Sequence, residues 1–318
     1  MTPYEFFGLT GKPFDLGPDP TFLYLSQSHK EALASAVYSV REGKGFLALI
    51  GEPGSGKTTL LEALRTRLER ECHLITLPAM PEMTYPDLAR AILEKLDFPA
   101  VGRWDDTTAV RAIRQQMAEF WVTGRQVVIA IDEAQALSSD TLEKIRLLSN
   151  LDPRELSVVP AVRNWGKIRL LAESAPSRGR WVGIILAGQS SLMDRLLLPD
   201  LSQLRQRIAI YCRLRPLEGS EVAHYIRCRL GVVGYRGPDL FTPRALDSLS
   251  RASEGNPRTL NILCDHALLV GFTRKTRPIP GSVIEAVARN LETQREPRGG
   301  LSDPFRGLVT GRREGRGR

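Results

Sequence analysis

Residues 46–64 (FLALIGEPGSGKTTLLEAL) limit the possible folds of this chain more strongly than any other segment. The apolar start of this stretch, Phe46–Ile50, has the length of one buried strand, and leucines at helical spacing follow from Leu60 onward. The residues between them match the spacing G-x-x-x-x-G-K-[ST]. Such a loop directs successive backbone N–H groups at one anion, and the helix N-terminus adds partial positive charge. The stretch therefore predicts a phosphate-binding loop within an α/β fold.

The residues of this loop have separate chemical roles. We expect Lys57 to reach the terminal phosphates of a nucleoside triphosphate, and the Thr58 hydroxyl to take one position on a Mg²⁺ ion. The predicted nucleotide contacts are Gly51, Glu52, Pro53, Gly54, Ser55, Gly56, Lys57, Thr58 and Thr59. The alternative is a glycine-rich turn that binds nothing, but the complete spacing in this context favours a binding loop. ATP and Mg²⁺ are therefore the expected cofactors.

A second apolar run, residues 126–131, ends in Asp132 and Glu133. By itself this is a weak signal, since many strands end at acidic loop residues. Here strand-like and helical stretches alternate between the loop and this run, which predicts a parallel sheet. At the end of such a strand, Asp132 would hold the water shell of Mg²⁺, and Glu133 would polarise the water that attacks the γ-phosphate. Together the two motifs predict a P-loop ATPase.

Polar residues next to two later strands are further candidates. Gln189 follows the strand-like residues 181–187 and would sense the γ-phosphate, with Ser190 as the second choice and a plain turn residue as the alternative. Arg205 and Arg207 precede a probable fifth strand, so one of them would be offered to the nucleotide of a neighbouring subunit. A lone surface arginine, however, is more often simply solvated.

The composition of the chain changes along its length and divides it into four parts. These parts are an arm and helix (1–45), an ATPase core (46–214) with an apparent insertion at 152–180, a helical lid (215–293), and a basic tail (294–318) expected to be disordered. The arm either packs against the sheet, which we favour, or forms a wall beside the nucleotide base. In the lid, Ser220 and Thr242 are expected as helix N-caps. Arg258 lies in the first turn of a lid helix, where a cation opposes the helix dipole, so we expect it to be paired or functional.

The overall composition, 42% apolar and 25% charged, is that of an ordinary globular protein. The four cysteines lack metal-ligand spacing, so we expect free thiols in a reducing compartment. We find no secretory signal pattern and no run near the roughly 18 apolar residues of a membrane span, and therefore expect a cytoplasmic location. Half of the net charge of +8 lies in residues 295–318. This surplus indicates either contact with nucleic acid or an anionic membrane surface, or a solvated tail.

Several blocks of the sequence resemble the AAA+ ATPases of the general secretion pathway protein A (ExeA-like) group. The blocks are YEFFGLTGKPFDLGPDPTFLYLSQSHKEAL, GEPGSGKTTLLEAL, VVIAIDEAQAL, ILAGQSSLMDRL, LRQRI, RLRPLEGSEVAHYIRCRL and SEGNPRTLNILCDHALLVGF. The resemblance implies a five-stranded AAA+ core, a helical lid and nucleotide-dependent oligomerisation into a ring or filament. By position it implies Lys57 and Thr58 as phosphate and Mg²⁺ ligands, Asp132 and Glu133 as the Walker B pair, Gln189 as sensor 1, Arg258 as sensor 2, and Arg205 or Arg207 as the intersubunit arginine.

Two departures from this family leave the biological role open. Secretion-type members usually continue into a membrane span and a peptidoglycan-binding domain, whereas this sequence ends in an arginine- and glycine-rich segment. The insertion at 152–180 is also longer than the family pattern.

Three functions follow as hypotheses. The first is an ATP-driven motor that assembles or remodels an envelope apparatus for type II secretion or a type IV pilus, which the N-terminal block favours. The second is a DNA-bound regulator that acts with a transposase, which the basic insertion and tail favour. A non-hydrolysing scaffold is disfavoured, because Lys57 and both acidic residues are present.

Overall fold

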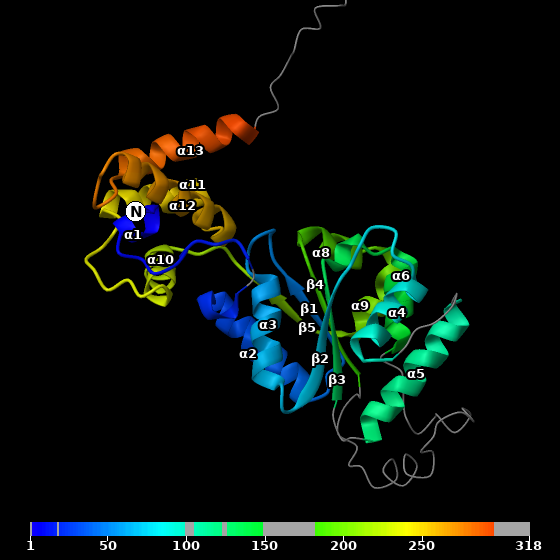
Figure 1. Ribbon diagram of the computed structural model, residues 1–318. Coiled ribbons are helices and arrows are strands. Elements are labelled where there is room, and N and C mark those ends of the chain that lie inside the picture. The colour runs from blue at the N-terminus through cyan, green and yellow to red at the C-terminus, as the bar shows by residue number, and fades with distance from the viewer. Residues whose placement is uncertain (1, 18, 99–104, 123–125, 149–181, 296–318) are drawn as a thin grey trace, which may run out of the picture.

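The computed structural model describes residues 2–17, 19–98, 105–122, 126–148 and 182–295 (Figure 1). Its centre is a five-stranded sheet in which all the neighbouring strands run parallel, in the order β2-β3-β4-β1-β5. The strands are β1 (Phe46–Ile50), β2 (Cys72–Pro78), β3 (Gln126–Asp132), β4 (Val182–Gly188) and β5 (Ile208–Arg213). This arrangement confirms the predicted α/β fold with a five-stranded parallel sheet.

Helices cover both faces of the sheet because side chains of a strand point alternately to opposite sides. In β1, Phe46, Ala48 and Ile50 enter one hydrophobic cluster, whereas Leu47 and Leu49 enter another. The first cluster includes side chains of α4 (Tyr85–Lys95), α5 (Asp106–Val122), α6 (Ser139–Leu148), α8 (Ser190–Leu196) and α9 (Ser202–Arg207). The second includes α2 (Gln27–Arg41) and α3 (Lys57–Leu68). Both faces of the core are therefore buried.

The lid is a separate helical layer with its own hydrophobic core (Figure 1). It consists of α10 (Glu221–Val232), α11 (Pro243–Ser253), α12 (Pro257–Thr273) and α13 (Gly281–Arg295). Thr242 caps α11 as expected, because its side chain accepts a hydrogen bond from the N–H of Ala245. Ser220 occupies the expected N-cap position of α10, but its backbone already has helical angles and its side chain makes no capping hydrogen bond.

The N-terminal arm packs mostly on the lid, which corrects our preferred expectation of packing against the sheet, although Leu25 packs against the core cluster on one face of the sheet. Phe7 and Phe14 are fully or nearly fully buried among the lid side chains, and the short helix α1 (Pro3–Phe6) lies beside α12. The arm also contains a single 3₁₀ turn, η1 (Pro20–Phe22), which contacts α10. The aromatic residues of the arm thus complete the core of a small helical layer that would otherwise expose apolar surface.

A buried arginine of the lid holds the arm in place. Arg229 on α10 donates hydrogen bonds from Nε to the Pro13 carbonyl (2.5 Å) and from Nη2 to the Asp15 carbonyl (2.8 Å). Its guanidinium group also lies over the Phe22 ring, 4.5 Å from the centroid. Because a buried charge is costly unless its donors are satisfied, these contacts hold the arm at Pro13, Asp15 and Phe22.

Several expectations lie at or beyond the limits of the described residues. The insertion at 152–180 lies outside them, as does the tail from residue 296, and α13 reaches Arg295, just past the predicted end of the lid. Of the cysteines, Cys72, Cys212 and Cys264 are buried and Cys228 is partly exposed, and none of them forms a disulfide within the described residues. Among the described helices, none is long and apolar enough to cross a membrane.

Candidate nucleotide-binding site

The predicted phosphate loop joins β1 to the N-terminus of α3, as the sequence pattern requires. Gly54 and Gly56 have φ angles of 79° and 94°, in the left-handed region that favours glycine. Gly56 occupies the N-cap position of α3, where no side chain of the described residues accepts a capping hydrogen bond. The N-terminal N–H groups of α3 therefore point into the loop without a side-chain cap, which suits an anion.

Lys57 is held inside this loop. Its side chain is buried, and its Nζ atom donates to the carbonyl oxygens of Gly51 (2.8 Å) and Glu52 (3.3 Å). Burial lowers the pKa of Lys57, against the opposite effects of the nearby carboxylates of Glu133, Asp132 and Glu52. The ammonium group is thus placed where a phosphate can replace backbone carbonyls as its partner.

The predicted metal ligands lie in direct contact. The Thr58 hydroxyl donates to Oδ2 of Asp132 at 2.5 Å, which brings the start of α3 to the end of β3. Mg²⁺, which this type of fold implies, takes hard oxygen ligands and few protein side chains. A hydroxyl and a carboxylate oxygen that already converge beside the phosphate loop fit that requirement, so Thr58 and Asp132 are the residues that would hold the ion.

Glu133 and Gln189 meet at the ends of β3 and β4. The Oε2 atom of Glu133 accepts hydrogen bonds from Nε2 of Gln189 (3.0 Å) and from Nε2 of Gln135 (2.5 Å). Burial raises the pKa of Glu133, but these two hydrogen bonds and the charge of Lys57 outweigh that effect and lower the pKa. Glu133 is therefore ionised at neutral pH, as a general base must be. Gln135 was absent from the predicted site.

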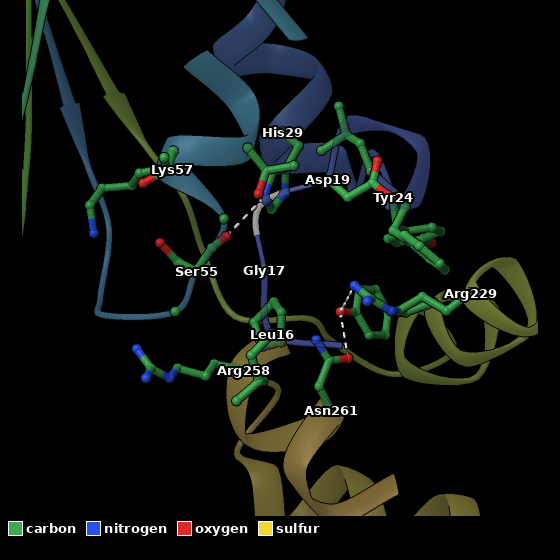
Figure 2. Close-up of a pocket in the computed structure, with 18 of the residues that line it drawn as sticks. Leu16, Gly17, Asp19, Tyr24, His29, Ser55, Lys57, Arg229, Arg258 and Asn261 are labelled. Carbon is green, nitrogen blue, oxygen red and sulfur yellow. Dashed lines mark hydrogen bonds between the residues drawn. The ribbon is translucent and has the colours of Figure 1, made fainter. Parts of the chain in front are cut away.

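The lid contacts the phosphate loop through the N-terminus of α12. Asn256 caps this helix with Oδ1, and its Nδ2 donates to the carbonyl oxygen of Pro53 at 2.8 Å. Arg258 is exposed and lines the pocket, and a Cβ atom added to Gly54 would overlap its side chain. Figure 2 shows Arg258 extending from the lid beside the loop. Its predicted position at the nucleotide is therefore consistent with the fold, and Asn256 is a contact that sequence reasoning missed.

The pocket itself has a volume of about 300 Å³ and walls from three parts of the chain (Figure 2). The loop and α3 supply one wall, the lid supplies Tyr225, Arg229 and Asn261, and the arm supplies Leu16 and Tyr24. The arm therefore lines the pocket as well as packing on the lid, so the sequence alternative of an arm beside the nucleotide agrees with the structure.

His29 supports the phosphate loop from behind. This buried residue of α2 makes hydrogen bonds through Nε2 to the Ser55 carbonyl (3.0 Å) and through Nδ1 to Oγ of Ser26 (2.7 Å). Because a carbonyl can only accept, Nε2 carries the proton and Nδ1 accepts from the Ser26 hydroxyl. A Cβ atom on Gly56 would lie 3.0 Å from Nε2, so the glycine leaves room for this contact. Nothing in the local sequence pattern marks His29.

The structure does not bring Arg205 and Arg207 into this pocket. Both lie on α9, immediately before β5 at the edge of the sheet, and neither is among the residues that line the pocket. Nη1 of Arg205 donates to the Leu197 carbonyl at 3.2 Å. Their predicted contact with the nucleotide of a neighbouring subunit stays a prediction.

Substitution of His29 is expected to change how stability depends on pH. Burial lowers the pKa of His29 below its ordinary value of 6.5, although the Ser55 carbonyl and Glu221 act in the opposite direction. Below that value the unfolded chain binds a proton that the folded chain does not, so stability falls as the pH drops from 6.5 toward the folded pKa. The melting temperature of His29→Gln should therefore fall less than that of the wild type when the pH is lowered from 7.5 to about 5.5.

Thermal unfolding at both pH values measures this difference. His224→Gln, at an exposed position on α10, is the matched control and should keep the wild-type dependence. An identical pH dependence in His29→Gln and the wild type would contradict the assigned role of His29.

Comparison with known proteins agrees with this geometry. General secretion pathway protein A of Aeromonas hydrophila is 34% identical over 296 residues, which is 92% of this chain and 49% of that protein. This chain therefore spans about half the length of that relative.

Solved structures share the fold at low identity. The ORC2 protein of Aeropyrum pernix, whose structure was determined in ADPNP-ADP complexes, has a TM-score of 0.59 at 15% identity. The structural match covers 87% of this chain and 71% of the ORC2 chain. Cdc6p of Pyrobaculum aerophilum has a TM-score of 0.61 at 13% identity, with coverages of 86% and 70%. At such identities these likenesses concern the fold alone.

A family model described as an AAA domain matches residues 40–196, which include the phosphate loop, Asp132, Glu133 and Gln189. The match, the parallel sheet and the pocket between core and lid agree with one another. They also agree with the identity to the Aeromonas protein over most of the chain. The chain therefore belongs to the nucleotide-binding AAA+ ATPases, and within them it is related to general secretion pathway protein A.

Proposed function

We propose that this protein is a Mg²⁺-dependent ATPase that couples ATP binding and hydrolysis to the assembly or remodelling of an envelope apparatus for type II secretion or a type IV pilus. The observation that carries the ATPase part is that Lys57, Thr58 and the ionised Glu133 line one pocket, with Asp132 in contact with Thr58. The identity to general secretion pathway protein A supports the envelope role.

Each residue of this site has its own proposed chemical role. The loop N–H groups and Lys57 bind the phosphates. Thr58 and Asp132 would hold Mg²⁺, which would neutralise part of the phosphate charge. Glu133 orients the attacking water and accepts its proton, since its carboxylate is ionised and adjacent to the loop. Gln189 lies between the carboxylate and the end of β4, where a γ-phosphate oxygen can compete for its amide.

The protein is proposed to act as an oligomer, in a ring or filament. Arg205 lies outside its own pocket and close to exposed apolar side chains, because it contacts the carbonyl of Leu197. Leu197 and Leu198 are 56% and 45% exposed. An arginine beside an exposed apolar patch at a sheet edge is suited to an interface between copies, where it would approach the nucleotide of the neighbour.

The DNA-regulator hypothesis rests on residues outside the described part of the chain. Its expected phosphate contacts were Arg163, Lys167, Arg169, Arg178 and Arg180 of the insertion, together with the arginines of the tail. The described residues therefore add no observation that favours duplex DNA and a transposase as partners. The cytoplasmic location likewise remains a prediction.

Two substitutions should separate ATP binding from hydrolysis. Glu133→Gln should retain ATP affinity and lower kcat by roughly 10²–10⁴-fold, because the loop is intact but the water loses its base. Lys57→Ala should lose ATP affinity, because the phosphates lose their charged partner. Titration with a fluorescent ATP analogue and phosphate-release kinetics measure the two effects. Hydrolysis at the wild-type rate in Glu133→Gln would remove Glu133 from the mechanism.

Mixing of variants tests the intersubunit arginine. If Arg205 or Arg207 acts in trans, alanine at that position should abolish hydrolysis while each protomer still binds ATP. A mixture with Lys57→Ala protein should then recover part of the activity, since one intact interface forms from two damaged partners. Turnover per protomer should also rise steeply with protein concentration. No recovery with either arginine variant, and turnover independent of concentration, would contradict a trans role.

The envelope role has its own test in the source organism. Chromosomal Lys57→Ala and Glu133→Gln alleles should reduce the assembled envelope multimers without lowering the amounts of their unassembled subunits. In vitro, fluorescence anisotropy with a duplex should show no gain in affinity when a slowly hydrolysed ATP analogue replaces ADP. A gain that falls steeply with salt, because bound phosphates release counterions, would favour the DNA regulator.

A further inference from the structure

Gln135 lies in a closed set of hydrogen bonds between the ends of β3 and β4. Its Nε2 atom donates to Oε2 of Glu133 at 2.5 Å, and its Oε1 atom accepts from the backbone N–H of Gln189 at 3.1 Å. The set closes because Nε2 of Gln189 donates to the same Glu133 oxygen at 3.0 Å. Both polar atoms of the Gln135 side chain are therefore hydrogen-bonded. Nε2 binds the carboxylate of Glu133, and Oε1 binds the backbone of Gln189, the residue expected to sense the γ-phosphate.

Neighbouring groups hold Gln135 in this position. Gly188, the last residue of β4, leaves the space that the amide occupies, because a Cβ atom there would lie 2.6 Å from Oε1 of Gln135. The backbone is held as well, since Nη1 of Arg195 on α8 donates to the Gln135 carbonyl at 2.5 Å and also to that of Leu137. The amide is thus fixed by structure on both sides and is not a freely rotating surface group.

We propose that Gln135 is a positioning residue for ATP hydrolysis, which holds the Glu133 carboxylate in one orientation and links it to the backbone of Gln189. This inference rests on the proposed ATPase function. Both glutamines contact Oε2 of Glu133, so the other carboxylate oxygen, Oε1, is the one that neither glutamine occupies and that serves the water.

The need for two donors follows from the position of Glu133. The Glu133 side chain is half-buried and accepts both of these side-chain hydrogen bonds on Oε2, so the two glutamines set its orientation. If the amide of Gln189 turns toward a γ-phosphate oxygen, it gives up part of its hold on Glu133. Gln135 then remains as the donor that holds Oε2 of Glu133, while its Oε1 atom still holds the Gln189 backbone.

Two substitutions separate the two ends of Gln135. Gln135→Met keeps the length of the side chain and removes both hydrogen bonds. Gln135→Glu keeps an acceptor for the Gln189 N–H but places a second carboxylate against Glu133. Gln27→Met is the matched control, because the Gln27 amide also donates to a glutamate, Glu31, but at an exposed site on α2.

The kcat of ATP hydrolysis is the main measurement, with ATP affinity measured in parallel. We expect Gln135→Met to lower kcat by roughly tenfold, because the Glu133 carboxylate loses one of the two side chains that orient it. Gln135→Glu should lower kcat further, because a second carboxylate repels that of Glu133. ATP affinity should change little in both variants, and Gln27→Met should match the wild type in both measurements.

Amide hydrogen exchange at Gln189 provides a second readout that needs no turnover. Protection of this N–H should be lost in Gln135→Met and kept in Gln135→Glu. If the variants keep the wild-type kcat while the wild type hydrolyses ATP, the inference is overturned and the proposed function stands. If the wild type hydrolyses no ATP, the proposed function fails, and equal protection of Gln189 in all the variants would overturn the link as well.

Discussion

The site depends on a backbone that turns through left-handed angles at Gly54 and Gly56, where a side chain would be both strained and in the way. These angles aim the loop at a phosphate, and the missing Cβ atoms admit neighbours from two other parts of the chain. Arg258 of the lid packs against Gly54, and His29 of α2 reaches the loop beside Gly56. The same two glycines thus shape the phosphate cradle and connect it to its surroundings.

Those connections make the pocket a meeting point of three parts of the chain. Asn256 joins the lid to the loop through the Pro53 carbonyl, and Arg229 joins the arm to the lid through the carbonyls of Pro13 and Asp15. A nucleotide in the pocket would touch all three parts at once. A difference in the position of the lid would therefore reach the arm through the hydrogen bonds of Arg229.

The charge arrangement on the β-strand side of the pocket follows from burial. A buried lysine and a half-buried carboxylate are each unfavourable alone, and each is stabilised by the other and by polar groups around it. The outcome is a carboxylate that is ionised beside a cationic loop, which is the state required for a base that acts next to phosphate. The amides of Gln135 and Gln189 add hydrogen bonds without adding charge, so they stabilise the ionised carboxylate without competing for the lysine.

The local sequence of the chain was sufficient for the fold class, the five strands, the phosphate loop, and Asp132 and Glu133. All of these depend on short-range patterns: apolar runs of strand length, glycines at fixed spacing, and acidic residues at a strand end. The arm was placed wrongly, because an aromatic segment can bury itself against any apolar surface, and only the lid offered one that it completes. The remaining contacts needed the tertiary structure, since their partners are distant in the sequence. Asn256 lies 203 residues from Pro53, and Gln135 lies 54 residues from Gln189. A single polar side chain carries no local signal of such a partner, because the hydrogen bond exists only after the sheet and the lid have brought the two residues together.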